Sequence, residues 1–253
     1  MRRRSDSRSK VWCVFIHGLG CTRESFDDAF GAEALDDFSL LALDLPGHGD
    51  SDRPEDFGYT MDDHASAVAA LLDSLGCEAV HLIGHSMGGT VAQLLLDRLP
   101  SPPRSVVSVE GNLIDDDCRF GSRGIAAVSI DEFLASGFEA FRASIDPSAS
   151  AGYARYVEWV SRVSPVALHR SAASLVEWSD SGTLLDSFLS LPVPAAYIYG
   201  ADNDQAAVVP LLQSATVIRV PDAGHFVMND NPGVFYRALA ERLQSSGSGE
   251  AVT

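Results

Sequence analysis

Six short runs of apolar and β-branched residues recur along this chain, and they constrain its fold more than any other feature. Each run is five to seven residues long, a length typical of a buried strand. Their apolar residues are consecutive rather than alternating, which predicts strands buried on both faces of a sheet, as in parallel sheets. The runs cover residues 11–16, 39–43, 79–84, 105–110, 194–200 and 215–220.

Amphipathic segments with helix start and stop signals lie between several of these runs. Thr60 precedes apolar residues at helical spacing that end at Gly76, the pattern of a capped helix. Asn231 and Pro232 open another such segment. Strands alternating with helices predict an α/β fold with a doubly wound, mostly parallel sheet of about six strands and helices on both faces. Functional groups in such sheets gather at the carboxyl ends of the strands.

Residues 112–190 interrupt this alternation, because they are helical in character and rich in aromatic side chains. We expect an inserted helical cap there, on an α/β core formed by residues 11–111 and 191–244. The polar ends, residues 1–10 and 245–253, are expected to be disordered tails. The aromatic residues of the insertion either pack cap helices or line a pocket: Phe120, Phe133, Phe138, Phe141, Tyr153, Tyr156, Trp159 and Trp178.

Composition excludes several classes of partner. The 35 acidic and 18 basic residues give a formal charge of −17, so the average surface repels nucleic acid and anionic lipid. The apolar run at 11–16 is too short for a signal peptide or a membrane span. The four cysteines form no CxxC pair and have no histidine at metal-ligand spacing. We therefore expect a cytoplasmic protein that acts on a small molecule without a metal or cofactor and binds neither nucleic acid nor membrane.

The strongest motif is the sequence GHSMGG at residues 84–89. An apolar run leads into it and a helical segment follows, which is the strand, tight turn and helix that a GxSxG nucleophile elbow requires. Gly84 and Gly88 are expected because this turn brings backbone segments too close for a Cβ. The pattern predicts that Ser86 is an exposed nucleophile at the apex of the turn.

A serine hydroxyl is a poor nucleophile at neutral pH and needs a nearby base, for which histidine has a suitable pKa. Among the seven histidines, His225 follows the last predicted strand on a loop before the final helix. A side chain on that loop can reach across the sheet edge to Ser86. We predict that His225 is the general base.

Four motifs in this order resemble those of the α/β-hydrolase family, over residues 11–243. They are HGLG at 17–20, DLPGHG at 44–49, GHSMGG at 84–89 and PDAGH at 221–225. The resemblance implies a serine, acid and histidine triad in that chain order. It also implies an oxyanion hole of two backbone N–H groups, which by position belong to Leu19 and Met87.

The acid of the triad is where the sequence departs from the family pattern. Family members usually carry it after the penultimate strand, where this chain has Asn203 between Asp202 and Asp204. The other position known in the fold is the end of the strand after the nucleophile helix, and there the chain has Glu110. A carboxylate that closes an apolar strand is costly without a partner, so we favour Glu110 and keep Asp202 as the alternative, with Asp204 behind both.

These residues predict a serine hydrolase that cleaves a small, apolar or aromatic ester, thioester or lactone through an acyl-enzyme. Related enzymes that open epoxides or remove halogens use an aspartate at the elbow, so Ser86 argues against both reactions. Carbon–carbon bond hydrolysis and lyase chemistry on the same triad remain alternatives. A ligand receptor that retains the fold without turnover is a further alternative of a different class.

Overall fold

The six apolar runs form six parallel strands of one sheet, and each strand matches its run to within one residue. The structure is a computed structural model that describes residues 1–5 and 10–247. Seven strands lie in the order β1-β3-β2-β4-β5-β6-β7. The parallel strands are β2 (Val11–Ile16), β3 (Ser39–Leu43), β4 (Ala79–His85), β5 (Ser105–Val109), β6 (Ala195–Gly200) and β7 (Thr216–Val220).

A seventh strand, β1 (Arg2–Arg4), joins the six expected ones and corrects the expectation of a disordered tail over residues 1–10. It pairs antiparallel with β3 at the edge of the sheet. The Arg3 guanidinium lies 4.5 Å from the centre of the Trp12 ring, and that of Arg2 lies 4.3 Å from the Phe30 ring. These cation–π contacts hold a charged segment whose composition does not indicate a strand. Residues 6–9 of the expected tail lie outside the described residues.

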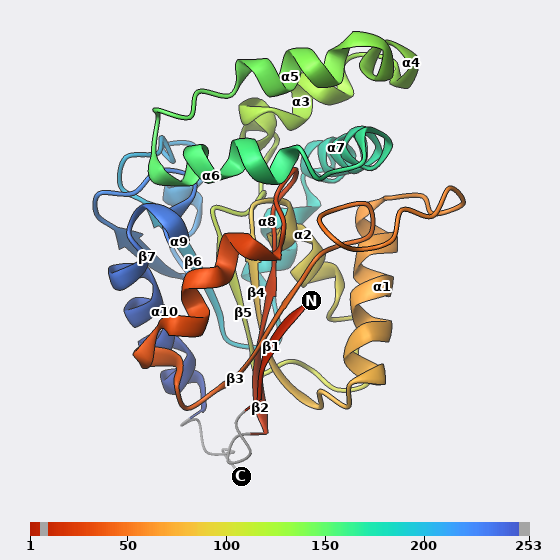
Figure 1. Ribbon diagram of the computed structural model, residues 1–253. Helices are drawn as coiled ribbons and strands as arrows, with labels where there is room; N and C mark the ends of the chain where they lie inside the picture. Colours follow the sequence, from red (N-terminus) through yellow and green to blue (C-terminus); the bar gives the residue numbers. More distant parts are fainter. Residues whose placement is uncertain (6–9, 248–253) are drawn as a thin grey trace.

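Helices cover both faces of the sheet (Figure 1). In Figure 1, α1 lies against one face, and α9 and α10 lie on the other. The α-helices are α1 (Met61–Ser74), α2 (Met87–Leu94), α3 (Ser122–Ala126), α4 (Ile130–Glu132), α5 (Phe138–Ser144), α6 (Ala151–Val160), α7 (Pro165–Asp180), α8 (Thr183–Leu189), α9 (Val227–Asp230) and α10 (Pro232–Gly247). Short 3₁₀ and π segments are η1 (Arg23–Gly31), η2 (Glu33–Leu35), η3 (Asp115–Phe120), η4 (Phe133–Gly137) and η5 (Val209–Leu211).

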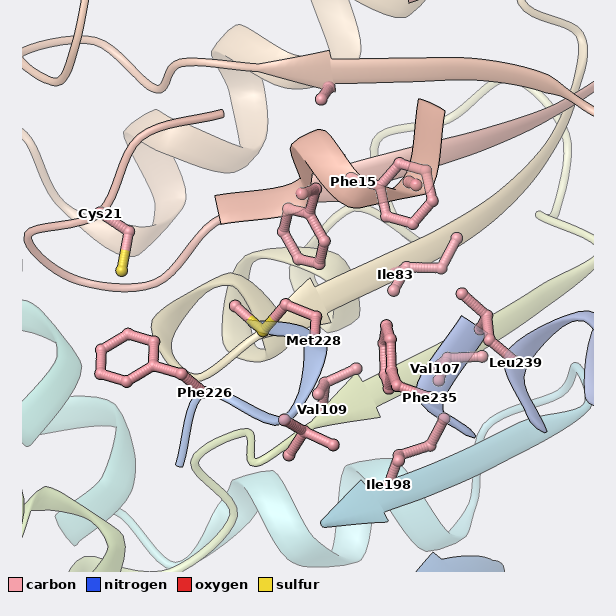
Figure 2. Packing of buried hydrophobic residues seen from close by; sticks show 14 of the residues in the cluster. Phe15, Cys21, Ile83, Val107, Val109, Ile198, Phe226, Met228, Phe235 and Leu239 are labelled. Atoms are coloured by element: carbon pink, nitrogen blue, oxygen red, sulfur yellow. The ribbon is translucent and has the colours of Figure 1, made fainter. Parts of the chain in front are cut away.

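Consecutive apolar residues of each strand supply two hydrophobic cores. Because strand side chains alternate between faces, Phe15 of β2 packs in one core, while Val14 and Ile16 pack in the other. Figure 2 shows the first core, where Phe235 and Leu239 of α10 lie over the sheet. Burial on both faces is therefore the reason that these strands read as unbroken apolar runs.

Both helices expected from capping signals are present. Thr60 and Asp63 form a reciprocal capping box at the start of α1, and Gly76 follows its end with a φ of 64°. Helix α10 begins at Pro232 as expected. It continues to Gly247, so the expected disordered tail from residue 245 starts too early, and residues 248–253 lie outside the described residues.

The elements between β5 and β6 are all helical, and Figure 1 shows α3 to α7 above the carboxyl end of the sheet. Helix α8, expected to belong to this cap, instead packs on the sheet, where Phe188 lies with its ring centre 6.5 Å from that of Tyr197 on β6. Within the described ranges, no helix is both long and apolar enough to cross a membrane.

A buried histidine joins the cap to the core. The Oγ of Ser171, on cap helix α7, donates its one proton to the Tyr59 carbonyl at 3.0 Å. It therefore acts as the acceptor for the Nε2–H of His64 on α1, at 2.9 Å. Burial lowers the pKa of His64 to about 3, so the ring is neutral in the folded protein. The unfolded chain takes up a proton near pH 6.5, which the folded chain does not.

This difference predicts a loss of stability in acid. Above pH 6.5 the ring is neutral in both states, whereas between pH 6.5 and 4 His64 lowers the free energy of unfolding by about 1.4 kcal/mol per pH unit. His81, whose pKa burial lowers to about 4, acts in the same direction. The free energy of unfolding is measured by urea titration at pH 7.5 to 4.5. His64→Gln should make its decrease with falling pH shallower by the contribution of about one proton. An unfolding free energy independent of pH over this range contradicts the assignment.

Candidate active site

Ser86 lies at the apex of the sharp turn between β4 and α2. Its φ of 51° is strained for a residue with a Cβ. The turn is held because the Ser86 N–H donates to the Val109 carbonyl at 2.9 Å and Gly89 N–H donates to the Ser86 carbonyl at 2.8 Å. A Cβ on Gly84 would collide with the Gly88 carbonyl oxygen, which is the close approach expected from the motif. The hydroxyl of Ser86 is thereby presented to a pocket under the cap.

The loop that follows β2 is fixed by a neutral histidine. His17 Nε2 accepts the Leu45 N–H at 3.0 Å, so its Nδ1 is the protonated nitrogen and donates to the Gly18 carbonyl at 2.9 Å. From the cap, the Tyr156 hydroxyl donates to the Leu19 carbonyl at 3.1 Å. Hydrogen bonds from the core and from the cap therefore hold the peptide groups on both sides of Leu19.

Two backbone donors are available beside Ser86. Within the described chain, the N–H groups of Leu19 and Met87 donate to no other group. Leu19 lines the pocket, and Met87 is the first residue of α2, where helix N–H groups have no partner inside the helix. This arrangement is suited to stabilising an oxyanion.

His225 lies on the loop between β7 and α9, and it lines the same pocket as Ser86. The Asp230 carboxylate accepts the N–H of the preceding Gly224 at 3.0 Å. The His225 carbonyl accepts the Nε2–H of His85 at 2.9 Å, and the two rings lie 4.8 Å apart. The residue before the nucleophile therefore positions the loop of the candidate base.

Sequence reasoning missed His85, although it stands inside the GxSxG motif. Burial lowers its pKa well below the usual range, so it is a neutral donor. The available signal was a polar residue at the end of an otherwise apolar strand.

Glu110 is the buried carboxylate that faces His225. Its side chain is fully buried, and Oε2 lies 3.7 Å from His225 Nδ1. Oε1 accepts the Gly200 N–H at 2.7 Å, and Oε2 accepts side-chain N–H bonds from Asn203, at 2.6 Å, and from Gln205. Asn203, which occupies the usual acid position of the family, is thus a donor to Glu110.

The structure does not bury the alternative acids. Asp202 is exposed on the loop after β6, where it lines an open surface groove. The Asp204 side chain is 70% exposed and lies 3.5 Å from Arg119. Glu110 is therefore the candidate acid that the fold places opposite the imidazole and shields from water.

Both apolar and polar side chains line the pocket, which has a cavity volume of about 60 Å³. Three cap aromatics line it, Phe141, Tyr153 and Tyr156, whereas Phe133 and Trp159 are buried in the core. The side chain of Phe120 lies outside the part of the chain that the structure describes. Among the described residues, no cluster of histidine, cysteine or acidic side chains could hold a metal ion.

Comparison with known proteins assigns the family. The model of the alpha/beta hydrolase family matches residues 13–238, so the chain belongs to that family. A 2-succinyl-6-hydroxy-2,4-cyclohexadiene-1-carboxylate synthase from Enterobacter sp. is 28% identical over 92% of both chains. The dihydrolipoyllysine-residue acetyltransferase component of an acetoin cleaving system from Cupriavidus necator is 44% identical over 38% of this chain. The chain spans about a quarter of the length of that protein and of a second curated relative.

Solved structures share the fold. The mutant of an N-acyl homoserine lactonase in complex with N-hexanoyl homoserine lactone superposes with a TM-score of 0.77 and 19% identity. The match covers 98% of this chain and 95% of the lactonase. This likeness, together with the family match, establishes the expected α/β-hydrolase fold.

The two candidate acids predict different mutational effects. Glu110→Gln should lower kcat about a hundredfold or more, because a neutral amide stabilises neither the required tautomer nor the imidazolium. Asp202→Asn changes the same charge at an exposed position and serves as the matched control, with kcat within about twofold of wild type. Both are measured with one ester substrate, and circular dichroism confirms folding. The reverse ranking overturns the assignment of Glu110.

Proposed function

We propose that this protein is a serine hydrolase that cleaves a small, uncharged ester, thioester or lactone through an acyl-enzyme intermediate. The observation that carries this proposal is that Ser86, His225 and Leu19 line one pocket. The backbone N–H groups of Leu19 and of Met87, the residue after Ser86, are unengaged within the described chain. The buried carboxylate of Glu110, 3.7 Å from the imidazole, supports the role of His225 as the base.

In the first step, the Ser86 Oγ bonds to the substrate carbonyl carbon while the imidazole of His225 takes the hydroxyl proton. The carbonyl oxygen becomes an anion, which the N–H groups of Leu19 and Met87 stabilise. Glu110 remains ionised and stabilises the imidazolium. When the carbon–oxygen or carbon–sulfur bond breaks, the imidazolium gives its proton to the leaving group.

In the second step, His225 takes a proton from water, which attacks the acyl-enzyme carbonyl. Collapse of the second oxyanion releases the carboxylic acid, and Ser86 recovers its proton from the imidazolium. His225 thus passes the serine proton to the leaving group in the first step and the water proton to Ser86 in the second. No group other than substrate, water and these side chains is needed.

The pocket lining argues against an anionic substrate. No lysine or arginine is among the described residues that line it, whereas Asp117 is. One relative is named for a carboxylate product, and a carboxylate would have no cation to pair with in this pocket. The small cavity, compared with the several hundred Å³ usual for ligand pockets, favours a short acyl group.

Matched phenyl esters test this proposal. We expect phenyl butyrate to be hydrolysed with a kcat/KM about tenfold or more above that of phenyl succinate monoester, because burying the unpaired carboxylate is costly. γ-Butyrolactone and a butyryl thioester complete the set. Ser86→Ala should abolish the activity. A wild type that turns over none of these compounds, or prefers the succinate ester, contradicts the proposed function.

A further inference from the structure

Three polar residues outside the proposed chemistry line one wall of the pocket. Asn112, Asp117 and Ser122 follow β5, at the start of the cap, and all three belong to the pocket that contains Ser86. Asn112 and Ser122 are buried, at 3% and 7% exposure. A polar atom that lines a pocket and has no partner within the protein is a candidate for binding a ligand.

The Asp117 carboxylate is only half engaged. Its Oδ2 accepts the N–H groups of Leu113 and Ile114 at 2.8 and 3.0 Å. No group of the described chain donates to its Oδ1. Burial raises the pKa of Asp117 to about 6, and the nearby charges of Asp116 and Glu110 act in the same direction. At pH 8 the side chain is therefore still an ionised acceptor.

Cys118 accepts one hydrogen bond from each of the other two residues. The Ser122 hydroxyl donates to the Cys118 carbonyl at 3.2 Å, and the Asn112 amide nitrogen donates to the Cys118 Sγ at 3.6 Å. The oxygen atoms of both side chains remain as acceptors. The wall thus has an accepting character, whereas the oxyanion hole of the same pocket offers donors.

We propose that Asn112, Asp117 and Ser122 form a subsite for an uncharged N–H or O–H donor of the substrate. The subsite rests on the proposed function, because it orients a carbonyl compound whose oxygen lies in the oxyanion hole. An amide or hydroxyl fits better than an ammonium group, because the apolar neighbours Ile125 and Phe141 would have to desolvate a full charge. The substrate class is accordingly an ester or lactone that also carries an amide N–H or a hydroxyl.

A nearly isosteric pair of esters tests the subsite at pH 8. N-acetylglycine phenyl ester has an amide N–H where O-acetylglycolate phenyl ester has an oxygen. We expect wild type to prefer the amide by about tenfold in kcat/KM, the effect of a hydrogen bond to a charged acceptor. A 3-hydroxybutyrate and 3-methoxybutyrate pair extends the test to an O–H donor.

Asp117→Asn tests the residue itself. The asparagine carbonyl can still accept both backbone N–H groups, but its NH₂ then replaces Oδ1, so the preference should fall below about twofold. Asp116→Asn removes the same charge from a residue outside the pocket lining and should keep the wild-type ratio. Thermal melts confirm that both variants fold.

The outcomes separate the two proposals. A wild type that hydrolyses both members of each pair at equal rates overturns the subsite and leaves the ester hydrolase standing, whether or not the variants fold. A preference that survives Asp117→Asn also overturns it. If wild type hydrolyses neither member of any pair and none of the simple esters, the proposed function is overturned, and the subsite with it.

Discussion

The buried carboxylate of Glu110 is the contact on which the geometry of the site depends. It stands directly after β5 and accepts hydrogen bonds from the Gly200 backbone, at the end of β6, and from the side chains of Asn203 and Gln205. A buried carboxylate that loses such partners costs about 3–5 kcal/mol, so this set of donors is strongly maintained. The contact joins the end of β5 to the end of β6 and the loop after it, and places Oε2 3.7 Å from His225 Nδ1.

The parallel sheet places the remaining groups within reach of this carboxylate. Strands β2, β4 and β7 all end at the same edge, so the HGLG loop, the Ser86 turn and the His225 loop meet there. Each loop is then held by a contact across elements: His17 to the Leu45 N–H, Ser86 to Val109, and His85 to the His225 carbonyl. The strained φ of Ser86 persists because its neighbours over-determine it.

Local features of the sequence were sufficient to predict the parallel strands and the nucleophile turn. The strands are buried on both faces, so their limits could be read from unbroken apolar runs, and the glycines around Ser86 report a close backbone approach. Strand β1 could not be predicted, because Arg2 and Arg3 are held by rings distant in sequence. The sequence left Glu110 and Asp202 as alternatives, since only the folded chain brings Asn203 onto Glu110. Asp117 gave no local signal, because its proximity to Ser86 arises from the cap.

A fluorophosphonate probe tests directly whether Ser86 is an activated nucleophile, without knowledge of the substrate. Oγ of an activated serine attacks the phosphorus and displaces fluoride, which intact-mass spectrometry records as one added phosphonyl group. We expect a single label on wild type and none on Ser86→Ala. Absence of labelling on folded wild type with a small probe, or equal labelling of Ser86→Ala, would contradict it.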